Sequence, residues 1–231
     1  MTTNFLASFN KVLAVEGMLG NNYADKGGMT YKVISRIKHP GWPGWIIIDK
    51  LYTQASSSSK EVSLPSELLN AASAKKLSEA AAAENKFLNE VASELTAKTE
   101  NNSILQNPVR VFYHEEFGIT VRGDQLPSQA IADESFECAV NLGVQTAAEN
   151  LQQTINLLNR NARLYSDISV GGIIGSQTLS TLNRCISVNG ERLVYNLLNF
   201  YQAKHYIEIM ESDHAQEVFI GWFNRIEIIK M

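Results

Sequence analysis

The chain has 231 residues with a net charge of -4, and 45% of its residues are hydrophobic and 19% charged. This length and composition fit one large or two small globular domains with a substantial core. The negative charge and the absence of a Lys/Arg cluster exclude the usual pattern of a nucleic-acid-binding protein, and no run approaches the ~18 apolar residues of a membrane span.

The first part of the chain predicts a helix, a hairpin and a second helix. Apolar residues recur at helical spacing over 4–15, which predicts a helix there. Glycines and an Asn-Asn pair interrupt this pattern over 17–28, as is typical of a loop or small hairpin. Residues 29–37 suit a short strand, the Pro- and Gly-containing stretch 39–45 cannot be regular, and 45–54 again suit a helix.

Residues 55–103 differ in composition from the rest of the chain. Serines open the segment, and Pro65 lies near an expected helix start. An Ala-, Glu- and Lys-rich stretch with one imperfect apolar stripe follows. We favour an inserted helical hairpin that packs on the body of the protein; the alternative is a docking surface for a partner protein.

From residue 104 onward the sequence predicts a succession of helices. Their apolar residues recur at helical spacing, and glycines separate several of them. The expected helical segments are 104–118, 126–143, 144–160, 177–185, 191–210 and the closing 214–230.

Three residues near the N-terminus suit the acid–base hydrolysis of a glycosidic bond. Such hydrolysis needs a protonated carboxyl for the leaving oxygen and a second polar group that stabilises the cation or activates water. Glu16 ends an apolar helical run, a setting that raises a carboxyl pKa and keeps the group protonated. A loop that folds back would bring Asp25 and Thr30 to the far side of a bound sugar. The Gly27-Gly28 pair would let the backbone approach the substrate closely.

Taken alone, the same residues also fit a solvated helix end and an ordinary turn. A longer pattern favours the catalytic interpretation. Residues 16–35 read EGMLGNNYADKGGMTYKVIS, and this order resembles the signature of glycoside hydrolase family 108, E-G-G-Y … D-x-G-G-x-T-x-x-G-I-[ST]. The resemblance continues in HPGWPGWIIID at 39–49 and in DESFECAVNLG at 133–143, which is similar to the family's F-D-x-A-V-N-x-G helix.

Members of that family are bacterial and phage N-acetylmuramidases with a lysozyme-like fold. The resemblance therefore implies a mainly α protein, with a lysozyme-like α+β catalytic domain that carries a small hairpin. This domain would span 1–143, with 55–103 as its helical insertion. Glu16 would be the general acid, and Asp25 and Thr30 would position water or stabilise charge, without a metal, nucleotide or other cofactor.

Residues 144–231 resemble the helical peptidoglycan-binding-type module that usually follows such a domain. The sequences LQ at 151–152, GGIIGSQTL at 171–179 and GWFNR at 221–225 are similar to its L-Q, D-G-x-x-G-x-x-T-L and G-W-x-x-R elements. The order of the matching segments along the chain is the order that the family shows.

Four positions depart from these patterns. Met18 and Leu19 replace the family's second Gly and its Tyr, Val33 replaces the Gly before Ile, and Gly171 replaces the Asp of the module. Val33 would narrow the cleft where the family lets the backbone approach the substrate. These departures favour the alternative hypothesis, a catalytically degenerate module that binds peptidoglycan or a protein partner.

Several other residues are candidates for substrate contact. Trp42 and Trp45 offer faces for sugar stacking, or they anchor the core. Tyr113 would line a cleft or belong to the core, and Ser35 would support the loop by hydrogen bonding. The full set of substrate-contact candidates is Gly27, Gly28, Tyr31, Ser35, Trp42, Trp45, Tyr113 and Asn141. The aromatic residues that pack the second module, or in part line a glycan groove, are Tyr195, Phe200, Tyr201, Tyr206, Phe219 and Trp222.

The cysteines and histidines do not form a metal-binding pattern. Cys138 and Cys185 lie in apolar helical segments, so we expect two buried thiols in preference to a disulfide. His114 is followed by two glutamates, but it lacks a second histidine at ligand spacing, which favours a solvated helix face.

The sequence as a whole predicts a muramidase that hydrolyses the β-1,4 bond between N-acetylmuramic acid and N-acetylglucosamine in peptidoglycan glycan strands. The N-terminus lacks a convincing signal peptide. We therefore expect synthesis in the cytoplasm and action in the periplasm or cell wall, after export through a holin pore or a secretion system. The first route is that of an endolysin, and the second that of a secreted effector with an immunity or secretion partner protein.

Overall fold

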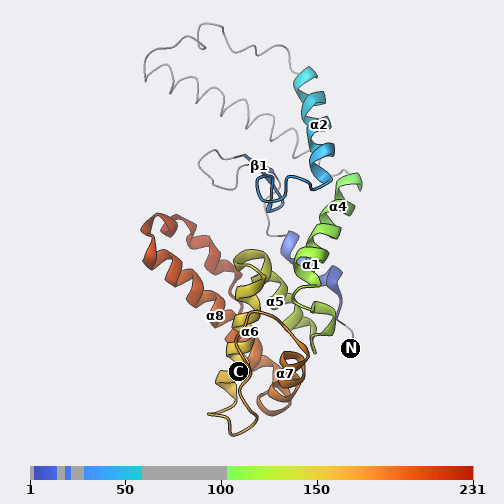
Figure 1. Ribbon diagram of the computed structural model, residues 1–231. Helices are drawn as coiled ribbons and strands as arrows, with labels where there is room; N and C mark the ends of the chain where they lie inside the picture. The colour runs from blue at the N-terminus through green and yellow to red at the C-terminus, as the bar shows by residue number, and fades with distance from the viewer. Residues whose placement is uncertain (1–2, 15–18, 22–28, 59–102, 231) are drawn as a thin grey trace. The chain divides into compact units, whose positions relative to one another are not determined.

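The computed structural model describes residues 3–14, 19–21, 29–58 and 103–230 (Figure 1). The chain forms two compact units, and each is described by itself. The helical unit comprises Met1–Ala14 and Tyr113–Met231, and the hairpin unit comprises Val15–Phe112. Within the described ranges, no helix has the length and apolar character needed to traverse a lipid bilayer.

The hairpin unit contains a small antiparallel sheet in its described part. Strands β1 (Leu19–Asn21), β2 (Met29–Tyr31) and β3 (Ile34–Ser35) pair in the order β1-β2-β3. Helix α2 spans Gly44–Ser58, and helix α4 spans Ser103–Tyr113. Each strand follows its neighbour in sequence, so the sheet is a simple meander.

Two tryptophans form the core of the hairpin unit. Trp42 and Trp45 are 6% and 2% exposed, and their rings meet edge to face with centroids 5.2 Å apart. Trp42 also stacks on Tyr31 of β2, and its indole N–H donates to the backbone oxygen of Pro108 in α4 at 3.2 Å. Gly44 makes room for the Trp42 ring, because a Cβ on this glycine would lie 2.1 Å from a ring carbon. This packing joins the sheet to the beginning of α2 and to α4.

An ion pair attaches the end of the sheet to α2. Arg36 follows β3, and its guanidinium donates to both carboxylate oxygens of Asp49, at 2.6 and 2.8 Å. Such paired bonds fix orientation as well as charge. The guanidinium also lies 5.2 Å from the centroid of Trp45. The hydrogen bond from Arg36 holds the pKa of the Asp49 carboxyl below its ordinary value.

Helices of different lengths make up the helical unit. They are, in chain order, α1 (Phe5–Leu13), the π-helical turn η1 (His114–Gly118), the 3-10 turn η2 (Gly123–Gln125), α5 (Gln129–Leu142), α6 (Val144–Leu158), α7 (Ser176–Asn189), α8 (Glu191–Ser212) and the 3-10 segment η3 (His214–Arg225).

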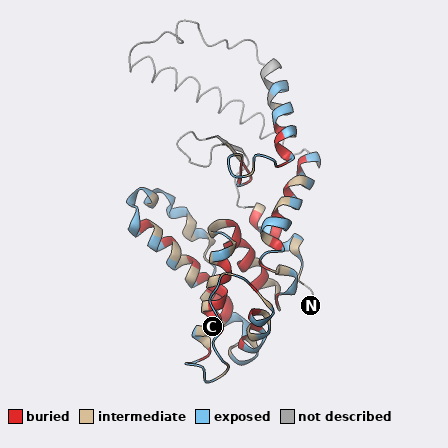
Figure 2. Ribbon diagram, in the orientation of Figure 1, coloured by how far each residue is buried: buried red, intermediate tan, exposed pale blue. Residues whose placement is uncertain are grey.

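Helix α5 is the centre of this unit. It packs against α1, α6, α8, η1 and η2, and nine of its 14 residues are buried (Figure 2). The Ser128 side chain accepts a hydrogen bond from the backbone N–H of Ile131, which caps the helix N-terminus. A helix surrounded in this way needs apolar residues on more than one face, as the sequence of α5 provides.

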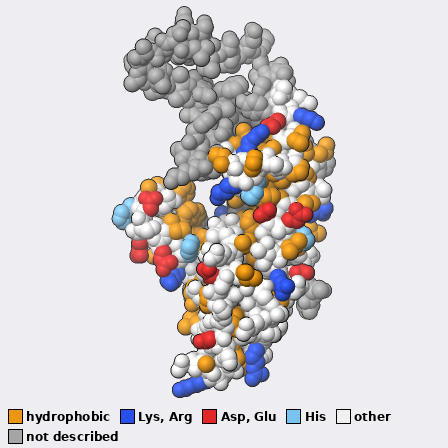
Figure 3. All heavy atoms as spheres, in the orientation of Figure 1, with side chains coloured by type: hydrophobic (Ala, Val, Ile, Leu, Met, Phe, Trp, Pro, Cys, Tyr) orange, Lys and Arg blue, Asp and Glu red, His pale blue; other side chains and the backbone are white. Residues whose placement is uncertain are grey.

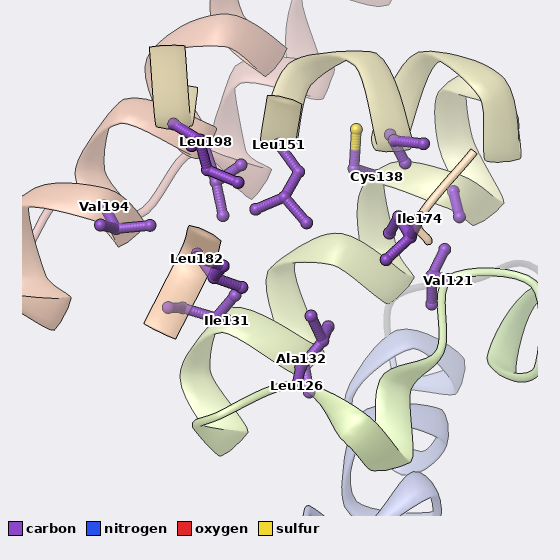
Figure 4. Packing of buried hydrophobic residues seen from close by; sticks show 14 of the residues in the cluster. Val121, Leu126, Ile131, Ala132, Cys138, Leu151, Ile174, Leu182, Val194 and Leu198 are labelled. Carbon is purple, nitrogen blue, oxygen red and sulfur yellow. The ribbon is translucent and has the colours of Figure 1, made fainter. Parts of the chain in front are cut away.

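Two groups of apolar side chains cover α5. Aliphatic side chains from α5, α6, α7 and α8 interdigitate in the main core (Figure 4). Aromatic rings from α1, α4, η1 and α5 meet at centroid distances of 5.5 to 6.4 Å. The members of this aromatic cluster are Phe5, Phe9, Tyr113, Phe117 and Phe136.

Most elements predicted from the sequence agree with the structure where it describes them. The closing segment 214–230 does not: it is a 3-10 helix only over His214–Arg225, and 226–230 have no regular structure. The side chains of Asn199 and Asn196 bind the backbone of that last stretch instead. Helix α1 lies inside 4–15, and 29–37 holds two strands instead of one because residues 32 and 33 turn the chain. The predicted hairpin insertion 55–103 lies outside the described residues except at its ends. Cys138 and Cys185 are buried free thiols, which confirms that prediction.

Helix α5 also buries two carboxyl groups. Glu134 and Glu137 are 2% and 7% exposed and lie three residues apart, on one face of the helix. Burial, with a further contribution from the charge of Glu137, raises the pKa of Glu134 to about 8. A hydrogen bond from Asn199 and the positive charge of Lys11 act in the opposite direction. In the folded chain the Glu134 carboxyl is therefore mainly protonated at neutral pH.

We predict that Glu134→Gln flattens the pH dependence of stability. The pKa of this group is about 8 in the folded chain against an ordinary 4.5, so the folded protein retains a proton that the unfolded chain releases between these values. The free energy of unfolding of the wild type must then fall as the pH rises through this window. Glutamine is neutral throughout, so the variant should lose this slope and exceed the wild type in stability above about pH 8.

Thermal denaturation followed by circular dichroism at about pH 5, 7 and 9 measures both slopes. Glu116→Gln is the matched control, because Glu116 is exposed and its replacement should leave the wild-type slope unchanged. Equal slopes in the wild type and the Glu134→Gln variant would contradict the prediction.

Candidate functional site

The segment that carries the predicted catalytic residue Asp25 joins two paired strands. Asn21 of β1 lies opposite Met29 of β2, and Gly20 lies opposite Thr30. Residues 22–28, which join the two strands, include Asp25, Gly27 and Gly28 and lie outside the described residues. Glu16 also lies outside them, in the segment between α1 and β1. The sheet thus holds the two ends of the Asp25 segment side by side.

Thr30 and Ser35 are neighbours in the same sheet. They lie opposite each other in the β2–β3 pairing, with Thr30 half-buried and Ser35 buried. The Ser35 hydroxyl oxygen accepts a hydrogen bond from the backbone N–H of Lys38 at 3.2 Å. Ser35 therefore supports the turn after β3, as the sequence suggested.

The β2–β3 turn has an unusual backbone. Its two central residues, Lys32 and Val33, have φ of 45° and 65°. Positive φ at both positions is the property of a type I′ hairpin turn, which matches the twist of the flanking strands. Positive φ is an outlier for a β-branched residue, and the Val33 side chain is 45% exposed. Val33 therefore occupies a strained conformation without a compensating place in the core.

The two tryptophans that the sequence suggested for sugar stacking are buried in the structure. Besides the contacts of Trp42 described above, the Trp45 indole N–H donates to the backbone oxygen of His39 at 2.8 Å. Tyr31, another candidate for substrate contact, is fully buried against Trp42. The core-anchor alternative describes what the two tryptophans do in the structure, and neither has an exposed ring face that would support sugar stacking. Tyr31 is part of the same core.

Tyr113 and Asn141 belong to the helical unit. Tyr113 is 0% exposed within the aromatic cluster, so the core alternative describes it. Asn141 is half-buried near the end of α5, and its Nδ2 group is buried without a hydrogen-bond partner among the described residues. Asn141 therefore keeps an unused donor, and its contact with substrate stays a prediction.

An exposed aromatic stack lies on α8 and η3. The rings of Phe219 and Trp222 are parallel within 4°, with centroids 5.1 Å apart, and Trp222 also contacts Tyr206 at 5.4 Å. Tyr206 is 2% exposed and Phe219 is 46% exposed, so the stack runs from the core to the surface. Val218 and Ile220 beside it are exposed as well. In Figure 3 the projection at the left shows exposed hydrophobic side chains among acidic and histidine side chains.

The sequence did not reveal the two buried acids of α5, which are core groups and not site residues. The available signal was a pair of glutamates three residues apart on one face of a helix that is buried over most of its length. A raised pKa is what a catalytic acid requires, but Glu134 is 2% exposed and cannot reach a substrate. Its perturbed pKa is a property of the core. Within the described residues, no three side chains of His, Cys, Asp or Glu form a cluster that could hold a metal ion.

Two protein families match successive parts of the chain. Residues 9–143 match the family described as Glycosyl hydrolase 108, and residues 147–227 match the family described as Predicted Peptidoglycan domain. The first match covers more than half of the chain. The chain belongs to the glycosyl hydrolase 108 family.

Among solved structures, the chain is similar to the structure of Brucella abortus SagA. The two chains are 16% identical, and the alignment covers 96% of this chain and 88% of the other with a TM-score of 0.52. At this identity the likeness shows the fold alone. A comparison with curated proteins gives no match.

These findings confirm the predicted fold class, a mainly α chain with a lysozyme-like glycosyl hydrolase 108 domain and a helical peptidoglycan module. The predicted boundary at 143–144 falls between α5 and α6, where Gly143 has a φ of 92°. Both helices belong to the helical unit. The assignment of 1–143 and 144–231 as separate domains stays a prediction.

The L-Q and glycine-containing elements of the predicted peptidoglycan domain hold the backbone in place through hydrogen bonds. The side-chain oxygen of Gln152 accepts hydrogen bonds from the backbone N–H groups of Gly171 and Gly172, at 3.0 and 3.1 Å. Its side-chain nitrogen donates to the backbone oxygen of Ile173 and to the hydroxyl of Thr178. A Cβ on Gly172, whose φ is 70°, would lie 2.5 Å from a side-chain carbon of α6. The motif therefore fixes the loop between α6 and α7.

The glycosyl hydrolase 108 pattern has glycine where this chain has Val33, and the structure gives that difference a physical meaning. Glycine adopts positive φ without steric cost, whereas valine does not. The sequence alone suggested that Val33 narrows a cleft; in the structure its effect is on the backbone of the turn.

We predict that Val33→Gly increases the free energy of unfolding by about 1 kcal/mol. Relief of the left-handed strain, worth roughly 1–2 kcal/mol, exceeds the extra entropy that glycine gives the unfolded chain, roughly 0.4–1 kcal/mol. Urea denaturation measures the change.

Val170→Gly is the matched control for this substitution. Val170 is 42% exposed and is not among the positive-φ residues, so only the entropy term applies and the control should lose stability. A Val33→Gly variant that is destabilised as much as this control would show that the turn carries no strain.

Proposed function

We propose that the protein is a peptidoglycan muramidase that hydrolyses the β-1,4 bond between N-acetylmuramic acid and N-acetylglucosamine. The observation that carries the proposal is the match of residues 9–143 to the glycosyl hydrolase 108 family, followed by the predicted peptidoglycan domain. The three-stranded sheet supports it, because β1 and β2 hold both ends of the segment that contains Asp25.

The proposed chemistry is general acid catalysis at a glycosidic oxygen. Glu16 donates a proton to the leaving oxygen as the bond to the anomeric carbon breaks. Asp25 and the Thr30 hydroxyl, which lies on β2, position the attacking water or stabilise the positive charge that develops on the sugar. Each of these roles needs only side-chain oxygens of the chain itself.

The alternative is a protein that binds peptidoglycan without cutting it. The observation that favours this alternative is Val33, which holds a positive φ at the position where the family's pattern has glycine. Product analysis distinguishes the two functions.

We predict that Glu16→Gln lowers the rate of muropeptide release by roughly 100-fold or more, because glutamine cannot donate the proton. Purified cell walls are digested and the products identified by mass spectrometry, which reports whether cutting occurs and which bond is cut. Glu115→Gln is the matched control, since Glu115 is an exposed glutamate of η1 and should keep full activity. If the wild type and the Glu16→Gln variant are equally inactive on several wall types, the muramidase proposal is wrong and only the binding function remains.

The aromatic stack of η3 is the surface that we propose for contact with the glycan strand. An exposed ring face packs against the apolar face of a sugar ring, and Phe219 presents such a ring at the end of the stack. The stack lies inside the predicted peptidoglycan domain, which spans 147–227. The Phe219 ring stacks on Trp222, and Trp222 in turn contacts the buried Tyr206.

We predict that Phe219→Ala weakens retention on insoluble peptidoglycan by about tenfold, which corresponds to the loss of one stacked ring. The measurement is a sedimentation assay in the Glu16→Gln background, so that the glycan is not digested. Phe200→Ala is the matched control, because Phe200 is 50% exposed on α8 against 46% for Phe219 and is not part of the stack. Equal retention of the two variants would exclude this surface.

The proposed substrate lies outside the cytoplasm. The proposal therefore includes export of the protein to the periplasm or cell wall, through a holin-type pore or a secretion system.

A further inference from the structure

A cavity of about 250 Å³ lies at the beginning of α1, within the helical unit. Residues of η1, η2 and α5 complete its wall. Phe5, Ile119 and Phe136 contribute apolar surface, and Arg122 and Asp124 contribute charged groups. The volume is just below the roughly 300–1,000 Å³ of pockets for drug-sized ligands, so the cavity suits a smaller molecule.

Arg122 is the unusual residue of this cavity. Among the described arginines, it alone is half-buried while its guanidinium makes no hydrogen bond or ion pair. By contrast, Arg36 is paired with Asp49. The backbone of Arg122 is also left-handed, with a φ of 52° and a ψ of 41°. Strain of this kind persists where the surrounding structure imposes it, and it is common at binding sites.

Some of the other polar groups that line the cavity are hydrogen-bonded within the protein, and others are not. The Thr3 hydroxyl donates to the backbone oxygen of Gly123, and the Ser8 hydroxyl donates to Asp133, both at 2.6 Å. The carboxylate of Asp124 is exposed, and no hydrogen bond or ion pair within the described part of the chain engages it. The side chains of His114 and Gln125 also line the cavity without a hydrogen bond among the described residues. Arg122 and Asp124 are thus the cavity's unpaired groups of opposite charge, and they lie beside apolar rings.

A guanidinium, a carboxylate and apolar rings in one cavity together define the chemistry of a ligand that would fit it. A guanidinium binds a carboxylate through two parallel hydrogen bonds, and a carboxylate such as Asp124 accepts an amide or ammonium N–H. The rings of Phe5 and Phe136, which line the same cavity, offer apolar surface to a small side chain. A ligand with a terminal carboxylate, a short apolar side chain and an N–H group is the end of a peptide.

We propose that this cavity binds the carboxylate end of a short peptide, with Arg122 on the carboxylate and Asp124 on the adjacent N–H. The identification of that peptide with the stem of peptidoglycan rests on the proposed function. The binding itself does not, because the site uses none of the residues proposed for hydrolysis or glycan stacking.

Isothermal titration calorimetry of the full chain with N-acetyl-alanyl-alanine tests the proposal. We expect measurable binding to the wild type and binding at least about tenfold weaker for the same dipeptide with an amide at its C-terminus, since one charge-assisted pair is lost. Arg122→Asn should weaken binding to a similar extent. Asparagine is chosen because it tolerates the left-handed backbone.

Arg160→Asn is the matched control. Arg160 is also an arginine with positive φ, 57°, but it is exposed and does not line the cavity, so this variant should bind as the wild type does. The comparison of acid and amide uses the wild type alone, which keeps the test decisive if Arg122→Asn fails to fold.

Three results would overturn the proposal: no binding of the dipeptide, equal binding of its acid and amide forms, or displacement of the dipeptide by inorganic phosphate at equal concentration. The last would mark an unspecific anion site. If the wild type releases muropeptides but does not bind the dipeptide, the proposed function stands and the peptide site is excluded. If it binds the dipeptide but does not cut cell walls, the peptide site stands and the proposed function is excluded.

Discussion

The burial of α5 is the constraint on which the helical unit depends. This helix lies in the part of the chain that matches the glycosyl hydrolase 108 family, yet it packs against α6 and α8 of the predicted peptidoglycan domain. The core around Ile131, Leu151 and Leu198 therefore draws on both family segments. A change in α5 acts on the two segments together, because neither has a separate core on this side.

In the helical unit, side-chain amides form paired hydrogen bonds with the backbone of neighbouring segments, as the strands of a sheet do with each other. Asn156 exchanges two hydrogen bonds with the backbone of Ile168, and Asn196 exchanges two with the backbone of Ile229. Together with Gln152, they satisfy backbone groups of segments that have no regular structure. These three polar side chains of the module thus have a structural role. Groups that remain for ligands are the ones that the architecture leaves exposed or unpaired, such as Phe219 and Arg122.

The sequence predicted the helices well, because apolar periodicity reports directly on which face is buried, and α1, α5 and α6 follow it. It also predicted a loop or small hairpin over 17–28 and a short strand after it, where the structure has the paired strands β1 and β2. It could not predict that Trp42 and Trp45 cover one another, since exposure of an aromatic ring depends on distant partners such as Pro108. The strain at Val33 and the protonated Glu134 were equally hidden, because backbone dihedrals and pKa values depend on tertiary surroundings. The placement of Glu16 and Asp25 lies outside the described residues and stays a prediction.

The interrupted path of the helical unit has a consequence for biosynthesis. Its first segment ends at Ala14 and its second begins at Tyr113, so α1 leaves the ribosome about 100 residues before the helices that cover it. At roughly 5–20 residues per second this is a delay of roughly 5–20 s. During that time Phe5 and Phe9 lack Tyr113 and Phe136, their partners in the folded chain. A segment as short as α1 is not a stable helix by itself. The nascent chain therefore exposes these apolar side chains, and this unit cannot complete its fold until its second segment has been made.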